Sequence, residues 1–312
     1  MNIHILIDYS FLYYKYKFQL ESGRMKRLTQ AMEWHGVTLE KDISQIYYSL
    51  REIENIRREW EGKGHCVTMS ICFDMPSRRK LANTSESNKY KSNRVNKLND
   101  EDFENIQFVQ KLLDTAGYNT YRIDGFEADD IVCYLIKKYA DEFEYNIIYT
   151  PDADLLVNID SNVGAMRYKS GKGYTAVTDK NFSDYLSTEM KCTIPYNAMT
   201  LFKCTVGDKS DCIDGIKGFG PAAFNKLVNR LNDMGIVWSN ARGYASTMAI
   251  LYNLKGYLTD VQLEQAYASL ELVKADEPTG AEVEYFNAPD RQSTYDKRAA
   301  AYGPYNMKSL ID

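Results

Sequence analysis

Short runs of apolar and β-branched residues recur between positions 3 and 168, and longer segments with helical periodicity separate them. In the segment 42–61, apolar residues return every three or four positions, which is the spacing of one helix face. Strands that alternate with helices in this way favour an α/β fold with a mostly parallel central sheet. We predict strands at 3–8, 67–74, 119–124, 145–150 and 163–168, and helices at 42–61, 101–117 and 126–140.

The strand signal fades after about residue 185, and the following ninety residues have helical patterning. We therefore predict an α/β domain over 1–185, a smaller helical domain over 186–275 and a C-terminal extension over 276–312. The sequence contains no internal repeat and no low-complexity tract.

Composition excludes several classes of protein. Hydrophobic residues make up 44% of the chain and charged residues 26%, which is ordinary for a soluble globular protein. No run of 18 apolar residues occurs, and the start MNIHILIDYS lacks the basic and long apolar regions of a signal peptide. The six cysteines form no CxxC pair, which indicates reduced thiols in a cytoplasmic protein. Only three histidines are present, which disfavours a zinc site.

Aspartates follow three of the predicted strands. Asp8 ends the first strand and Asp74 ends the second. Asp152 and Asp154 come directly after the fourth. Because the carboxyl ends of parallel strands meet at one edge of a sheet, we expect these acids to lie close together.

Five further acids fall at two places outside the strands. The stretch GFEADDIV places Glu127, Asp129 and Asp130 at the start of a helix, and we expect them to lie outside its apolar stripe. Asp208 and Asp211 have the i, i+3 spacing of one helical face. Helix capping is an open alternative for GFEADD and for PDAD when either is taken alone, since acids stabilise the first turn of a helix.

Taken together, nine carboxylates without matching basic neighbours would repel one another strongly unless cations bind. Oxygen ligands without Cys or His suit hard ions such as Mg²⁺ or Mn²⁺. Two such ions about 4 Å apart can clamp the attacking water and the leaving oxygen of a phosphodiester. The pattern therefore predicts a two-metal site that cleaves phosphodiesters.

A basic segment offers a surface for the substrate. Residues 75–99 hold seven basic residues and one acid, a net charge of +6, although the whole chain carries −5. Such a segment is either a solvated loop or a contact for nucleic-acid phosphates, and charge alone leaves both readings open.

The order GFEADD, then D-x-D, then G-D-x-x-D resembles the flap endonuclease and 5′-exonuclease family. That family includes the bacteriophage 5′-nucleases and the 5′-nuclease domain of DNA polymerase I. The resemblance covers roughly residues 1–230 and implies a PIN-like nuclease domain. It also implies that nine carboxylates hold the metal: Asp8, Asp74, Glu127, Asp129, Asp130, Asp152, Asp154, Asp208 and Asp211.

Tyr90, Lys91 and Arg94 match the family's Y-K-x-x-R motif, which lies in an arch over the active site. The resemblance implies an arch at about 75–110, in which Lys91 and Arg94 are catalytic and stabilise the scissile phosphate. It also implies that Arg78, Arg79 and Lys89 bind DNA.

The stretch GIKGFGPAAFNKLV, residues 215–228, resembles the family's helix–three-turn–helix DNA-binding element, although an ordinary helix connection is the alternative. The resemblance implies duplex contacts from four residues and the possibility of a K⁺ ion in the turn. The sequence departs from the family at Asp211-Cys212-Ile213-Asp214-Gly215, usually D-N-I-P-G, and at Pro221-Ala222-Ala223. The four residues are Lys217, Gly218, Gly220 and Lys226.

The resemblance implies a metal-dependent, structure-specific 5′-nuclease that acts on DNA with a 5′ flap, a nick or a free 5′ end, or on RNA–DNA hybrids. It further implies a monomer, at work in phage DNA replication in the host cytoplasm, with replication proteins as possible partners. Two alternatives stay open: a catalytically silent DNA-junction-binding protein on the same fold, and a PIN-like single-strand ribonuclease. Three tyrosines have either a base-stacking or a packing role: Tyr13, Tyr14 and Tyr16.

Overall fold

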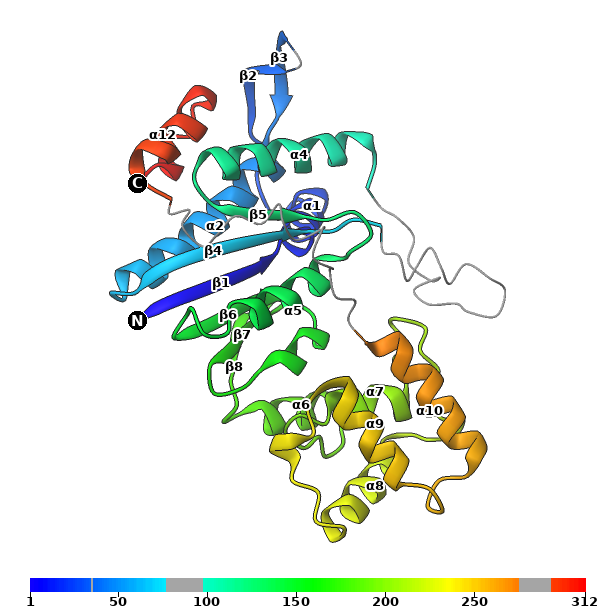
Figure 1. Cartoon of the computed structure of the whole chain (residues 1–312). Helices are drawn as coiled ribbons and strands as arrows, with labels where there is room; N and C mark the ends of the chain where they lie inside the picture. Colours follow the sequence, from blue (N-terminus) through cyan, green and yellow to red (C-terminus); the bar gives the residue numbers. More distant parts are fainter. Residues whose placement is uncertain (35, 77–97, 275–292) are drawn as a thin grey trace.

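The computed structural model describes residues 1–34, 36–76, 98–274 and 293–312. Its centre is a six-stranded sheet with the order β5-β4-β1-β6-β7-β8 (Figure 1). All neighbouring pairs are parallel except β7 and β8, so the mixed α/β fold with a mostly parallel sheet is confirmed. The strands are β1 (Asn2–Asp8), β4 (Cys66–Phe73), β5 (Asn119–Arg122), β6 (Tyr145–Thr150), β7 (Val163–Lys169) and β8 (Gly173–Val177).

Alternation along β1 explains how the helices cover the sheet. Ile3, Ile5 and Ile7 point to one face and pack in one buried cluster with α1 (Tyr9–Glu21), α2 (Ser44–Gly62) and α4 (Asp100–Thr115). Leu6 points to the other face and packs with α5 (Ala128–Lys138). A sheet that is buried on both faces in this way is typical of parallel strands linked by crossover helices.

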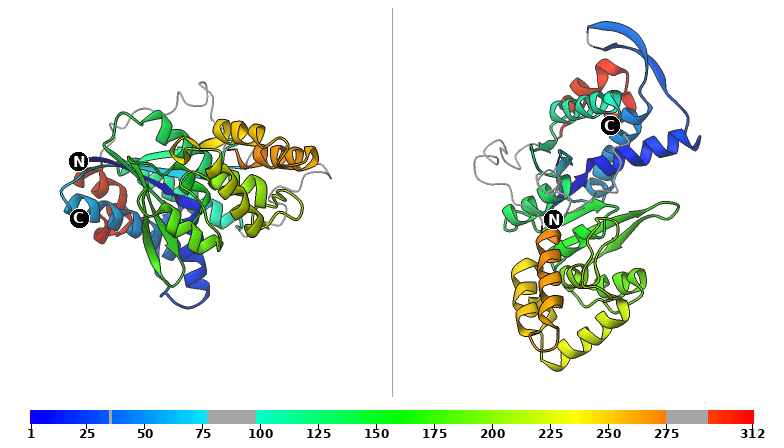
Figure 2. Two further views of the ribbon diagram at one scale, coloured as in Figure 1. Left: turned by 90° about the horizontal axis from the view of Figure 1, so that it is seen from below. Right: turned by 90° about the vertical axis from the view of Figure 1, so that its right-hand side faces the viewer.

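Four elements of this domain were not expected from the sequence. Helix α1 directly follows β1, and strand β8 adds an antiparallel edge. The strands β2 (Thr29–Trp34) and β3 (Val37–Asp42) form a separate antiparallel hairpin between α1 and α2. Figure 2 shows this hairpin projecting from the end of the molecule opposite the helical part.

The lower part of Figure 1 is helical, as predicted for residues 186–275. One buried cluster runs from the α5 face of the sheet into these helices without a break, because Phe202 and Phe224 pack in the same cluster as Ile131. The boundaries at 185 and 275 stay predictions. The helices are α6 (Phe182–Met190), α7 (Met199–Val206), α8 (Pro221–Asp233), α9 (Gly243–Asn253) and α10 (Asp260–Val273), with a short 3₁₀ turn η2 (Trp238–Asn240). Another 3₁₀ turn, η1 (Asp154–Asn158), lies between β6 and β7.

The last residues return to the first domain. Helix α12 (Tyr295–Tyr302) lies against α4, and the turns η3 (Gly303–Tyr305) and η4 (Lys308–Leu310) follow it. The Tyr302 hydroxyl donates to the buried carboxylate of Glu54 at 2.8 Å. Residues 295–312 therefore complete the packing of α2 and α4. Of the helices that the structure describes, none combines the length and apolarity needed to cross a membrane.

Candidate active site

Three aspartates, which we name the sheet-edge acids, lie where β1, β4 and β6 end. Asp8 caps α1, since its Oδ1 accepts from the backbone N–H of Phe11 at 3.3 Å. Asp74 accepts from the backbone N–H of Ala128 at 2.7 Å, which fixes it beside the start of α5. Asp8, Asp74 and Asp152 line one cavity of about 520 Å³. The strand-end rule thus brings these three residues together.

The electrostatics of the sheet-edge acids are unfavourable without a cation. Burial, with Asp74 and Asp152 adding to it, raises the pKa of Asp8 to about 8. Among the residues that the structure describes, no lysine or arginine forms an ion pair with Asp8. A pKa near 8 favours the protonated form of Asp8 at neutral pH as long as no cation is bound.

A second set, the α5 group, consists of Glu127, Asp129 and Asp130, whose carboxylate oxygens lie within 4.8 Å of one another. The backbone N–H of Glu127 donates to Asp130 at 3.2 Å in a capping box, so the acids do cap the helix. Asp130 is fully buried although it lies outside the apolar stripe of α5. The capping box turns this carboxylate back under the N-terminus of α5.

The third set, the loop group, consists of Asp154, Asp208 and Asp211, also within 4.8 Å of one another. The expectation that Asp208 and Asp211 share a helical face is wrong, because α7 ends at Val206 and both lie in the loop that follows. Two backbone hydrogen bonds between Asp208 and Ile213, at 2.7 and 2.8 Å, close this loop.

A glycine makes the tight loop possible. Gly207 has φ of +92°, and a Cβ there would lie 2.6 Å from the backbone oxygen of Ile213. Only glycine combines this conformation with such a close approach of two backbone segments. The G-D-x-x-D motif therefore has a direct steric reason for its first residue.

Lys203 is a site residue that the sequence prediction missed. Its ammonium contacts Asp154, and it lies 2.6 Å from Asp208 Oδ2, with 6% of the side chain exposed. The expectation of acids without basic neighbours is therefore wrong for the loop group. One signal was present in the sequence: Lys203 is the single charge in the apolar helix MTLFKCTV. A charge in such a helix is buried only with a partner.

Lys203 divides the loop group electrostatically. Burial raises the pKa of Asp154 to about 7, although the ammonium of Lys203 opposes the shift. Burial acts in the same direction on Asp208, but Lys203 and the hydroxyl and N–H of Ser210 together hold its pKa below the usual value. Asp208 is thus ionised and already has a cation beside it.

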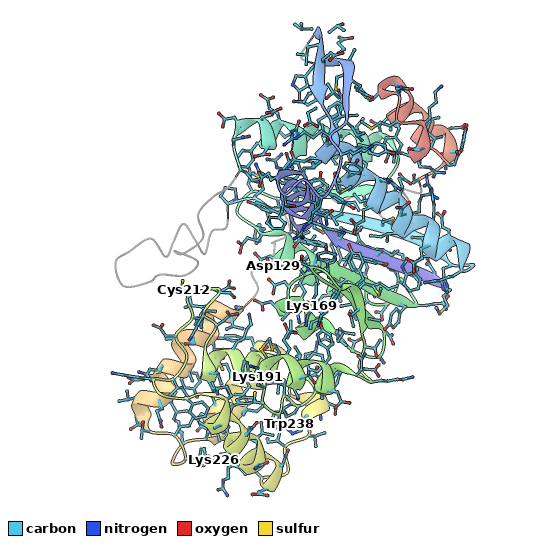
Figure 3. The ribbon with its side chains drawn as sticks, turned by 180° about the vertical axis from the view of Figure 1, so that it is seen from behind. Asp129, Lys169, Lys191, Cys212, Lys226 and Trp238 are labelled. Carbon is cyan, nitrogen blue, oxygen red and sulfur yellow. The ribbon has the colours of Figure 1, made fainter. Side chains whose placement is uncertain are left out.

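The predicted DNA-binding turn lies between α7 and α8. Gly215 and Gly218 have φ of +65° and +77°, in the region that favours glycine, while Gly220 is extended and precedes Pro221, the first residue of α8. Lys217 and Lys226 are exposed. In Figure 3, Lys226 lies toward the far end of the helical part, whereas Asp129 and Cys212 lie nearer its junction with the sheet.

The arch residues Lys91, Arg94, Arg78, Arg79 and Lys89 lie outside the described residues, and their roles stay predictions.

The tyrosines of α1 have different environments. Tyr13 is buried and its hydroxyl donates to Asp102 at 2.8 Å, while the Tyr16 hydroxyl donates to Glu52. Both therefore have packing roles. Tyr14 is exposed and lines the cavity of the sheet-edge acids together with Phe18 and Tyr168. Of the three candidates for base stacking, only Tyr14 is placed for it.

Comparison with known proteins supports one family. Residues 4–186 match the family model of the 5′-3′ exonuclease N-terminal resolvase-like domain. A 5′-3′ exonuclease of Aquifex aeolicus is 24% identical over 222 residues, 66% of this chain and 70% of that protein. The DNA polymerase I of Streptococcus pneumoniae is 31% identical over 202 residues, 64% of this chain. The chain spans 22% of that polymerase and 20% of the polymerase of Caldicellulosiruptor bescii.

Solved structures share the fold. The T5 D15 protein co-crystallised with metal ions has a TM-score of 0.57 and 14% identity, with all of both chains covered. A T5 D15 flap endonuclease in a complex with DNA and metal ions has a TM-score of 0.57 and 16% identity, over 99% of this chain and 97% of that one. The family match spans more than half of this chain and includes the sheet-edge acids, the α5 group and Asp154. The chain belongs to the 5′-3′ exonuclease family of nucleases.

Proposed function

We propose that this nuclease hydrolyses phosphodiesters of DNA near 5′ ends, flaps and nicks, and of RNA primers on DNA, with two divalent metal ions. The observation that carries the proposal is the gathering of nine carboxylates from separate parts of the chain. Bound divalent ions supply charge stabilisation and an activated water for such a hydrolysis.

The residues present fit divalent ions. The α5 group and the loop group offer only carboxylate oxygens, the donors that Mg²⁺ and Mn²⁺ prefer. The raised pKa of Asp8 indicates a site that gains from a cation. We assign the nine acids as the ligands of two Mg²⁺ or Mn²⁺ ions, and the Gly218 turn as a possible place for K⁺.

Basic residues orient the substrate in this proposal. Lys91 and Arg94 stabilise the scissile phosphate, and Lys91→Ala lowers single-turnover cleavage by about 10²–10³-fold with little change in affinity. Wild-type rates on a saturating flap substrate would contradict this role. The duplex is held by the remaining candidates: Arg78, Arg79, Lys89, Lys217, Gly218, Gly220 and Lys226.

The T5 flap endonuclease with the same fold was crystallised with DNA, which supports DNA as the substrate class. By the same likeness we infer a monomer that acts in phage DNA replication in the host cytoplasm. The proposed alternative is a catalytically silent DNA-junction-binding protein, and the three sets of acids argue against it because a binder needs no such ligands.

Digestion of 5′-labelled flap, nicked and RNA-primed duplexes tests the proposal. We expect cleavage near the 5′ end or the flap junction with Mg²⁺ or Mn²⁺, and none in EDTA. Binding without cleavage under every metal condition would favour the junction-binding alternative. Full cleavage by protein shown to be free of metal would refute the two-metal reaction.

A further inference from the structure

The proposed nuclease reaction leaves the lysine inside the loop group unexplained. Lys203 extends from α7, and its ammonium contacts Asp154 at the start of η1 and Asp208 in the loop after α7. Only 6% of the side chain is exposed. A buried lysine that joins two acids from different segments holds a defined position.

That position is the one a metal ion requires. The oxygens of Asp154, Asp208 and Asp211 lie within 4.8 Å of one another, so one small cation can reach all three. Two of these three carboxylates are already in contact with the ammonium of Lys203. A divalent ion in the loop group must therefore compete with this ammonium for the same oxygens.

The sheet-edge acids have no such competitor among the residues that the structure describes. Asp8 is buried beside the carboxylates of Asp74 and Asp152, and it forms no ion pair with any described residue. A first divalent ion can therefore enter beside the sheet-edge acids without displacing any side chain of the described residues. The two metal positions are thus unequal before any substrate binds.

We propose that Lys203 is an internal counterion that keeps the loop-group metal position closed until a nucleic-acid phosphate draws the ammonium away. The proposal rests on the metal-dependent nuclease function above. A lysine is a point charge on a flexible four-carbon stem, so it can exchange one anionic partner for another by rotating its side chain. Lys203 stays protonated throughout, and no covalent bond changes. The second ion then binds only after substrate has arrived.

Calorimetric titration of Ca²⁺ into the metal-free full chain tests this order without relying on activity. We compare the wild type, Lys203→Met and a control, Lys180→Met, which removes an exposed lysine between β8 and α6. Without DNA, we expect the second ion to bind at least about tenfold more tightly to Lys203→Met than to the other two proteins. A flap oligonucleotide should strengthen second-ion binding in the wild type and have much less effect in Lys203→Met. Equal affinity for the second ion in all three proteins overturns the proposal.

Thermal unfolding separates a counterion from an ordinary structural ion pair. Lys203→Met should unfold at a lower temperature than the wild type in EDTA, because Asp154 and Asp208 then repel each other. Saturating Ca²⁺ should remove most of that difference, since the ion replaces the lost ammonium. If the unfolding temperature of Lys203→Met stays equally far below that of the wild type in Ca²⁺, the ion pairs of Lys203 are only structural and the proposal is overturned.

A measurement on the wild type covers the case in which Lys203→Met does not fold. Crystals soaked in Mn²⁺, with and without bound DNA, locate each ion by its anomalous scattering. We expect an ion in the loop group only where the Lys203 ammonium has left Asp154 and Asp208. A fully occupied ion beside an unmoved ammonium overturns the inference and leaves the nuclease proposal intact. Failure of the wild type to bind any divalent ion overturns both.

Discussion

The sheet-edge acids and the loop group face the same problem of crowded carboxylates and resolve it differently. Burial, together with the neighbouring Asp74 and Asp152, raises the pKa of Asp8 to about 8. Asp208 lies beside Lys203, and despite burial its pKa falls below the usual value. One site is stabilised by a proton and the other by a built-in ammonium. A divalent ion must displace a proton in the first and a side chain in the second, so the two should respond differently to the same perturbation.

The largest expected effect tests whether the α5 group works with the sheet-edge acids. Asp130→Asn removes a buried charge but keeps an oxygen that can accept the capping hydrogen bond from Glu127. We expect cleavage to fall by about 10³-fold or more, as several kcal/mol of metal-based stabilisation are lost. Single-turnover assays with saturating flap substrate measure this. Asp141→Asn, an exposed acid after α5, is the matched control; equal rates in the two variants would remove Asp130 from the site.

The same change in the loop group should have a smaller effect. Asp208→Asn removes one carboxylate ligand from a metal position, and it also removes one of the two ion pairs of Lys203. We expect turnover to fall by about 10²-fold, with binding of flap DNA in Ca²⁺ largely intact. Fluorescence anisotropy in Ca²⁺ and cleavage in Mg²⁺ give the two quantities. The exposed Asp214 in the same loop provides the control Asp214→Asn. Parallel loss of binding and turnover in Asp208→Asn would assign the residue a structural role.

The pH dependence of stability distinguishes the proton from the ammonium. The folded pKa of Asp8, about 8, lies above its ordinary 3.8, so between these values the folded state keeps a proton that the unfolded state has released. The free energy of unfolding of the metal-free protein should therefore fall as pH rises toward 8. Asp208 has the opposite shift, and its contribution is lost only as the pH falls below the ordinary carboxyl range.

Thermal denaturation in EDTA from pH 5 to 9 measures this dependence. Asp8→Asn should reduce the slope of the curve between pH 5 and 8, and saturating Mg²⁺ should reduce it in the wild type. A wild-type curve that stays level in EDTA across that range would mean that Asp8 is not protonated in the folded protein.

Sequence patterns located the carboxylates but not their partners. Strand-end positions follow from periodicity, so Asp8, Asp74 and Asp152 could be placed together from sequence. Lys203 is a neighbour of Asp154 only because the chain brings α7 back to the start of η1. No spacing rule reports a contact between residues so far apart in the chain. The loop geometry of Asp208 was missed for a related reason, since i, i+3 spacing does not distinguish a helix from a tight turn.

The same limits apply to the fold. Strands rich in Ile and Val were predicted to within about two residues of their observed ends. Helix α1 was missed because its sequence YSFLYYKYKFQLE has aromatic residues on every side and so no single apolar stripe. The hairpin β2–β3 was missed because it lies mostly exposed, away from the hydrophobic core that gives strands their pattern.

The smallest expected effect lies outside all three sets of acids. Lys217 is exposed in the turn before α8, and its contact with a duplex phosphate would position the substrate without taking part in the chemistry. Lys217→Ala should weaken duplex binding several-fold, lower the salt dependence by about one unit of slope and spare the rate at saturation. Affinity measured at several salt concentrations gives the slope. A lower saturated rate with unchanged affinity would link this residue to the acids instead.

The return of the C-terminal residues to α2 and α4 has a consequence for synthesis of the protein. On the ribosome, β1, β4 and α2 emerge long before Tyr302, whose hydroxyl bonds to buried Glu54, and before Ile311, whose carbonyl accepts from Arg298 at 2.8 Å. A nascent chain that stops before residue 295 leaves that side of α2 exposed to water and Glu54 without one of its buried partners. The nuclease should therefore acquire its full stability only after residues 295–312 have been synthesised. Products that lack residues 295–312 should therefore be cleaved by proteases more readily than longer ones.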